Sequence, residues 1–537
     1  MSVARSHGET LIADVLHRLA SLLEQHRGRV PAGFLARFVV TAPDLDPRAV
    51  LRTSAGESFL WEPPSGVELG GLGRAASLAG SGAERLLQVR AAAAEVAGRL
   101  IAIAEPGLEA RPALFLGGGA FRPEGAVRAR WAGFGDASFV LPRWLIRRSP
   151  GGDSRLELTV DGAELQKGDL GDARARLLGE AEALLGSTPP PLEPGAARLI
   201  EASWEEPESE QERWYRATLG ILDAIRRGEL RKAVAARWLD VRLPLGRLSL
   251  GEGSRPGRDV PSPVVVERVL EAFERGCAEC VRFVVQRGGH AFLGATPELL
   301  LELSGLELGT HALAGTERAD PQDAMLERGA RSSGAGSTTR ASGESGCDAG
   351  GAAARRLLAR DKDRREHQLV VEHIVDRLTP YCSELVAPST PRVRSLRHLL
   401  HLETPITGRL ASPRHVLELA AALHPTPAVA GVPVERSLAL LAELEGGERG
   451  WYAGPVGWFD QRGDGALSVA LRSMLVGRSS ARLFAGAGIV ADSQPQAELE
   501  ETRWKLAGAW NALTAAVGEE LEIEQAPVCG GLGAKHE

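Results

Sequence analysis

The stretch Arg482-Leu-Phe-Ala-Gly-Ala-Gly-Ile-Val490 joins a strand-like run to two glycines, and a helical pattern begins a few residues later. Glycine carries no Cβ, so the backbone N–H groups of this stretch can come close to an anion. In the helical pattern Glu498, Glu501 and Lys505 stand at positions i, i+3 and i+7, which lie on one helix face. Two carboxylates at that spacing suit a hard cation such as Mg2+, and the lysine suits a ligand carboxylate, although solvated helix faces share the pattern. The stretch predicts a strand, a helix and a site for an anionic, metal-bridged small molecule.

Composition sets outer bounds on the protein class. The chain has 537 residues, 44% hydrophobic and 25% charged, which is typical of a globular protein with one large domain or two to three smaller ones. A formal net charge of -7 and the lack of a basic, aromatic-rich patch argue against a nucleic-acid partner. No apolar run reaches the roughly 18 residues of a membrane span, and charged residues interrupt Met1–Leu22 where a signal peptide would be apolar. We therefore expect no membrane partner and a cytoplasmic location.

The five cysteines are too few and too scattered for a disulfide framework. Cys277 and Cys280 form a lone CxxC pair without a second pair to complete a zinc site. We expect neither a metal nor a redox role for them.

The chain divides into two halves and a tail. Residues 1–200 mix helix candidates with short apolar strands and predict the N-terminal α/β half of the fold. The helix candidates are Leu11–Gln25 and Ala83–Ala104, and the strand candidates are Ala113–Phe115 and Ser138–Ile146. Residues 201–520 contain a predicted helix over Ser209–Arg227, a predicted strand over Lys232–Leu243 and most of the candidate chemistry, and residues 521–537 form a C-terminal tail.

Two further stretches have the composition of exposed loops. Leu245–Pro263 is rich in Gly, Pro and Arg, and Arg331–Gly351 consists almost wholly of small and polar residues.

Three side chains are candidates for acid–base or metal chemistry. Lys232 falls on an apolar strand face, where it is either a desolvated general base or an edge lysine that reaches water. Glu298 follows a turn among hydrophobic residues, where it either stays protonated as a general acid or caps the turn. Glu366 begins an amphipathic helix, where it is either a further metal ligand or part of an exposed ion pair.

Nine segments between about residues 205 and 520, taken in order, resemble the chorismate-utilising enzymes and among them most closely the isochorismate synthases. The segments are Lys232-Ala-Val-Ala-Ala-Arg, Gly294-Ala-Thr-Pro-Glu, Ala312-Leu-Ala-Gly-Thr, Lys362-Asp-Arg-Arg-Glu-His, His401-Leu-Glu-Thr-Pro-Ile-Thr-Gly, Leu423-His-Pro-Thr-Pro-Ala-Val-Ala-Gly, Trp451-Tyr-Ala-Gly-Pro-Val-Gly-Trp, Leu471-Arg-Ser and Gly486-Ala-Gly-Ile-Val. The chain departs from the family pattern in its insertion at 331–351 and at Ala466.

The resemblance implies a fold, a reaction and a cofactor. The implied fold is α+β, one large chorismate-binding unit in which two antiparallel sheets pack as a sandwich with outer helices. The implied reaction is the Mg2+-dependent isomerisation of the small molecule chorismate to isochorismate, in which water adds at C2 and the C4 hydroxyl leaves.

It also implies roles for matching residues. Lys232 matches the general base, Glu298 the general acid and His401 a histidine near the reacting face. The positions that match metal ligands are Glu366, Glu498 and Glu501. The positions that match substrate-binding residues are Thr316, Tyr452, Arg472, Gly486, Gly488 and Lys505.

Two positions separate the relatives. Ammonia-using members of the family carry glutamine where this chain has Lys232, and aminodeoxychorismate synthases carry a nucleophilic lysine where it has Ala314. The pattern favours isochorismate as the final product, with salicylate synthase and a catalytically silent chorismate-binding subunit as alternatives. Whether the product feeds menaquinone, siderophore or salicylate synthesis, and the oligomeric state, stay open at this point.

Overall fold

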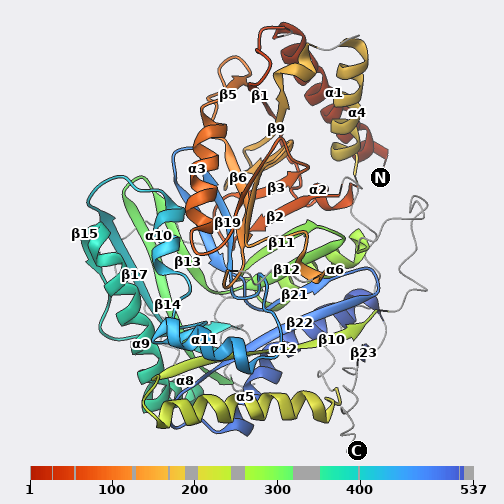
Figure 1. The fold of residues 1–537 in the computed structure, drawn as a ribbon. Helices are drawn as coiled ribbons and strands as arrows, with labels where there is room; N and C mark the ends of the chain where they lie inside the picture. The colour runs from red at the N-terminus through yellow and green to blue at the C-terminus, as the bar shows by residue number, and fades with distance from the viewer. Residues whose placement is uncertain are drawn as a thin grey trace, which may run out of the picture.

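The computed structural model describes residues 2–26, 28–53, 56–123, 129–166, 170–187, 204–243, 261–318, 351–396, 399–518 and 521–524. The strands in these ranges form two sheets that pack against each other with helices outside, which confirms the predicted α+β fold (Figure 1). Every described strand pair is antiparallel except β1 with β5.

The larger sheet has 13 described strands. In sheet order they are β18 (Gly431–Val432), β10 (Lys232–Arg242), β22 (Ser480–Ile489), β21 (Ser473–Val476), β12 (His290–Thr296), β11 (Val281–Arg287), β2 (Ser58–Glu62), β3 (Glu68–Leu72), β8 (Trp144–Arg148), β9 (Ser154–Asp161), β1 (Leu35–Thr41) and β5 (Leu100–Ala104), with β23 (Glu522–Ile523) paired to β10.

The smaller sheet has ten described strands. In order they are β15 (Cys382–Val386), β17 (Leu399–Leu410), β14 (Glu307–Arg318), β13 (Leu299–Ser304), β20 (Gly465–Val469), β19 (Pro455–Asp460), β6 (Leu114–Gly119), β7 (Ala137–Leu141) and β4 (Ala76–Gly80), with β16 (Arg392–Leu396) paired to β17.

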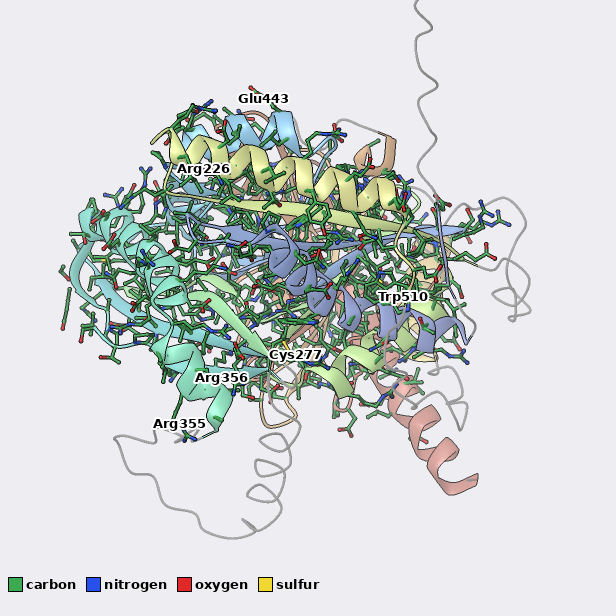
Figure 2. The ribbon with its side chains drawn as sticks, turned by 90° about the horizontal axis from the view of Figure 1, so that it is seen from below. Arg226, Cys277, Arg355, Arg356, Glu443 and Trp510 are labelled. Atoms are coloured by element: carbon green, nitrogen blue, oxygen red, sulfur yellow. A yellow bond between two sulfur atoms is a disulfide. The ribbon has the colours of Figure 1, made fainter. Side chains whose placement is uncertain are left out.

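Helices cover the outer faces of the two sheets (Figure 1). They are α1 (Ser2–Gln25), α2 (Ala49–Arg52), α3 (Arg85–Ala97), α4 (Leu170–Leu185), α5 (Glu208–Arg226), α6 (Pro263–Gly276), α8 (Ala352–Ala359), α9 (Asp361–Leu378), α10 (Val416–Leu423), α11 (Val434–Leu444) and α12 (Pro495–Val517). Figure 2 shows that α5, marked by Arg226, and α11, marked by Glu443, lie side by side. No helix in the described ranges combines the length and apolar character that crossing a bilayer requires.

Successive side chains along the strands of the larger sheet pack alternately into two hydrophobic cores. In β2 the side chains of Phe59 and Trp61 join the core between the sheets, whereas Leu60 joins the core beneath the outer helices. In β11 Phe283 and Val284 divide in the same way. Successive strand side chains point to opposite faces, so these strands are apolar on both faces and lie inside the molecule.

Each sheet contains one block of strands from the first half of the chain and one block from the second, and the two blocks meet at a single strand pairing. In the larger sheet β2 from the first half pairs with β11 from the second, and in the smaller sheet β6 pairs with β19. The two halves therefore share both sheets.

The structure corrects two predicted elements. The helix expected over Ala83–Ala104 ends at Ala97, and its last residues form strand β5. The single strand expected over Ser138–Ile146 is two strands, β7 and β8, separated at Pro142 and Arg143. The predicted loops at 245–263 and 331–351 lie outside the described residues except for their last positions.

No disulfide framework was expected in the chain, but Cys277 and Cys280 are bonded at the end of α6 (Figure 2). Their Cα atoms lie 5.5 Å apart because the chain turns tightly between α6 and β11. A local bridge of this kind depends on that turn and not on the number of cysteines in the chain.

Candidate active site

A cavity lies where β10, β22 and α12 face β14 and β17 of the other sheet. Ten of the twelve predicted site residues line it; Lys232 pairs with the lining residue Glu366, and Glu498 is close enough to the lining residue Glu501 for their charges to interact. The lining residues among the predictions are Glu298, Thr316, Glu366, His401, Tyr452, Arg472, Gly486, Gly488, Glu501 and Lys505. The pairing of β10 with β22, which sets Val234 opposite Gly488, brings the lysine strand beside the glycine strand.

Lys232 is the first residue of β10, and its side chain is 0% exposed. Its Nζ lies 3.0 Å from Glu366 Oε1, and the two groups form an ion pair. Burial raises the pKa of Glu366, but Lys232, Lys362 and Lys505 together outweigh it and hold that pKa below its usual value. Of the two interpretations of this lysine, the edge residue that reaches water is wrong.

Gly488 is the point where β22 comes closest to this ion pair. A Cβ at Gly488 would lie 2.1 Å from Glu366 Oε1 and 3.2 Å from Lys232 Cε. The ion pair therefore occupies the space that a side chain on β22 would take.

Glu298 lies in the short turn between β12 and β13, with 5% of its surface exposed. Thr296, not Glu298, closes the turn: its Oγ1 accepts the Glu298 N–H at 3.2 Å and donates to Val469 O at 2.6 Å. Burial raises the pKa of the Glu298 carboxyl to about 7, although the charges of Lys232 and Lys505 act against the shift. This carboxyl faces the cavity and can hold a proton near neutral pH.

His401 is neutral and forms hydrogen bonds on both sides of its ring. Its Nδ1 lies 3.1 Å from Gly315 O and 3.2 Å from Thr316 Oγ1, and its Nε2 lies 3.2 Å from Arg472 Nη2. Burial first, and then the Arg472 charge, hold the pKa of His401 well below its usual value. With Nδ1–H donating to the carbonyl of Gly315, Nε2 accepts from Arg472, which makes His401 a residue that positions this arginine.

Arg472 presents a half-buried guanidinium to the cavity. Among the described residues no carboxylate lies within ion-pairing distance of it. Its backbone φ is 49°, and that of Ala453, which also lines the cavity, is 63°. Left-handed backbone at non-glycine residues is strained and gathers at functional sites. Because the guanidinium lines the cavity and has no carboxylate partner in the described part of the chain, an anionic ligand could bind to it.

Tyr452 stands beside this cation. Its ring stacks on Phe484 with centroids 5.0 Å apart. Burial raises the pKa of the Tyr452 phenol, so the hydroxyl stays protonated and can donate.

Three lysines neutralise the three predicted metal carboxylates. Glu366 pairs with Lys232, Glu498 pairs with Lys362, and Glu501 pairs with Lys505 at 2.6 Å. Lys505 also donates to Gly486 O at 2.9 Å.

The predicted three-carboxylate metal site is not assembled in this arrangement. Within the described ranges no group of three or more His, Cys, Asp or Glu side chains is arranged to hold a metal ion. Buried carboxylates repel one another unless a counter-charge lies between them, and here the lysines supply it. Burial and the neighbouring Glu501 charge raise the pKa of Glu498, so a hard divalent cation fits the chemistry of these oxygens.

Two residues of the site were missed in the sequence. Lys362 stands one helical turn before Glu366 in a segment that was recognised, so the i, i+4 spacing was the available signal. Arg449 lines the cavity, pairs with the buried Glu445 and donates to Val429 O at 2.8 Å. Its only sequence signal was its place just before Trp451 and Tyr452.

Comparisons with known proteins give this site a context. A family model of chorismate binding enzymes matches residues 56–510. The chain is 31% identical over 524 residues to the salicylate biosynthesis isochorismate synthase of Pseudomonas aeruginosa, covering 96% of this chain and 98% of that protein. It is 30% identical over 403 residues to isochorismate synthase MenF of Bacillus subtilis, covering 75% of this chain and 74% of that protein. The solved structure of the menaquinone-specific isochorismate synthase MenF of Escherichia coli matches with a TM-score of 0.68 and 25% identity, covering 94% of this chain and 100% of that one.

Proposed function

The chain belongs to the chorismate binding enzyme family, and we propose that it is an enzyme that isomerises chorismate to isochorismate. The alignment with the Pseudomonas relative runs through nearly the whole of both proteins, so the proposal concerns the full chain.

One observation carries the proposal. A buried carboxyl with a raised pKa, Glu298, lines the cavity together with Arg472, whose guanidinium has no carboxylate partner among the described residues, and the buried Lys232 pairs with the lining residue Glu366. The isomerisation needs a base that activates water, an acid that protonates the leaving hydroxyl and a cation that holds a carboxylate. A silent binding subunit would need only the last of these.

The residues divide the work by their chemistry. Arg472 and Tyr452 hold a substrate carboxylate by charge-assisted and neutral hydrogen bonds, which fixes the ring in the cavity. Glu298 gives its proton to the C4 hydroxyl as that group leaves. Lys232 takes a proton from the water that adds at C2. An amine accepts a proton only when it is neutral, so the Glu366 carboxylate must first move away from Lys232.

Mg2+ is the proposed cofactor. Glu366, Glu498 and Glu501 would hold it, and it would supply positive charge against a substrate carboxylate. For the metal to bind, the lysines that pair with these carboxylates would have to move away from them.

The experiment is incubation of the purified chain with chorismate and Mg2+, followed by chromatographic and NMR identification of the products. We expect isochorismate to accumulate towards an equilibrium mixture with chorismate, with no anthranilate when ammonium is added. Salicylate and pyruvate as main products would show a salicylate synthase instead. Binding of chorismate without any turnover would show a silent subunit.

The consuming pathway differs among the relatives, one of which is named for salicylate biosynthesis and another for menaquinone. Isochorismate is the product that their names share.

A further inference from the structure

Side chains of the smaller sheet hold both peptide groups that flank Glu298. The Leu299 N–H donates to His311 Nε2 at 3.1 Å, on the C-terminal side of the acid. On the N-terminal side, Arg394 Nη1 donates to Pro297 O at 3.2 Å. None of these contacts was predicted, and neither His311 nor Arg394 lines the cavity.

Glu403 ties the two side chains together. Its Oε1 accepts from Arg394 Nη1 at 2.9 Å and lies 3.7 Å from His311 Nδ1. Glu403 lies opposite Leu313 in the pairing of β17 with β14, two positions from the pair of Pro405 with His311, so Glu403 and His311 share one face of the sheet. Arg394 also donates to Glu279 O at 3.2 Å, in the turn between Cys277 and Cys280, which gives its guanidinium a third fixed contact.

His311 is a neutral ring that accepts a hydrogen bond through Nε2. Because Nε2 accepts an N–H, the ring proton is on Nδ1, on the side of Glu403. Burial lowers the pKa of His311 to about 4, against a smaller opposing contribution from Glu403. The ring therefore stays a neutral acceptor throughout the pH range in which Glu298 titrates.

We propose that His311, Arg394 and Glu403 form a cradle that positions the Glu298 carboxyl for proton transfer. This inference rests on the proposed function, because it assigns Glu298 as the proton donor. The cradle residues act through the backbone of the turn and are positioning residues, since none of them is placed to touch the substrate.

The cradle controls the orientation of the Glu298 carboxyl and its burial. The backbone on both sides of Glu298 determines where its carboxyl points, and a displacement of about 1 Å in a reacting group can cost roughly 100-fold in rate. The charged and titratable groups that face Glu298 are Lys232, Lys505 and Tyr452, and none of them belongs to the cradle. Loosening the turn would admit water to the carboxyl and lower its pKa while these three groups stay in place.

The test compares His311→Leu with His311→Gln in steady-state assays of isochorismate formation across pH. Leucine removes the acceptor, whereas the glutamine amide oxygen can take the place of Nε2. We expect His311→Leu to lower kcat by roughly 10- to 100-fold at an unchanged KM and to move the high-pH limb of kcat downwards. His311→Gln should recover most of both.

His415 provides the matched control. It is also a half-buried histidine with a pKa lowered by burial to about 4, and its Nδ1 accepts the Leu417 N–H at 3.1 Å at the start of α10, away from the cavity. His415→Leu should lower the melting temperature but leave kcat and the pH profile unchanged. If His311→Leu does not fold, Arg394→Met, which removes the donor to Pro297 O, takes its place with the same expectation.

Wild-type kcat in both His311→Leu and Arg394→Met would overturn the proposal. So would equal impairment of His311→Gln and His311→Leu, or a fall in kcat with no movement of the high-pH limb. Failure of the proposed function is a separate result, because it would appear as a wild-type protein that forms no isochorismate.

Discussion

Glu298→Gln should remove activity and, above neutral pH, stabilise the fold. The carboxyl is buried, and burial raises its pKa from 4.5 to about 7. A raised carboxyl pKa means that the folded protein holds a proton that the unfolded chain releases, so wild-type stability falls as pH rises from 4.5 through about 7. The difference of about 2.5 pH units, at 1.36 kcal/mol per unit, amounts to about 3 kcal/mol.

The assay is chemical unfolding of both proteins in chelator at a series of pH values between 4 and 8. The stability advantage of Glu298→Gln over wild type should be small at pH 4 and grow by up to about 3 kcal/mol by pH 8, because the amide has no proton to lose. In the isochorismate assay the same variant should lose ~100- to 10,000-fold in kcat, the usual cost of removing a general acid.

Glu302→Gln, on the exposed face of β13, is the control and should show no such pH-dependent difference. A stability difference between Glu298→Gln and wild type that stays constant across pH would refute the reasoning.

Lys232→Ala should lower kcat by ~100- to 10,000-fold while calorimetry still detects chorismate binding, and a variant with wild-type turnover would contradict its role as base. Gly488→Ala places a Cβ 2.1 Å from Glu366 Oε1, so we expect this carboxylate to be displaced and kcat to fall by roughly 10- to 100-fold, with unchanged kcat as the opposing result. Lys362→Met removes the cation that pairs with Glu498, and calorimetric titration should show Mg2+ binding about 1 kcal/mol tighter, or roughly fivefold. Equal or weaker Mg2+ binding would show that Lys362 does not compete with the metal.

The sequence alone determined the fold class and most of the residues that line the cavity. Ordered segments identified the family, and strand alternation together with helix spacing put Lys232 on β10 and Glu501 and Lys505 on one face of α12. These inferences succeeded because they rest on identity and local periodicity, which a chain carries without reference to its fold.

Local sequence patterns did not predict the boundary between α3 and β5. The stretch after Ala97 was read as a continuing helix, but Leu100–Ala104 became a strand because it pairs with β1, some sixty residues earlier in the chain. Local propensity does not include the partner strand that decides between the two.

Only the tertiary structure decided which group each site residue contacts. It paired Glu366 with Lys232 and Glu498 with Lys362, placed His401 beside Arg472 and set His311 and Arg394 on either side of Glu298. These contacts depend on the register of β14 against β17 and on the packing of one sheet against the other. Periodicity predicts the face on which a side chain lies, but the charge, burial and hydrogen-bond partners it meets there come from residues far away in the sequence.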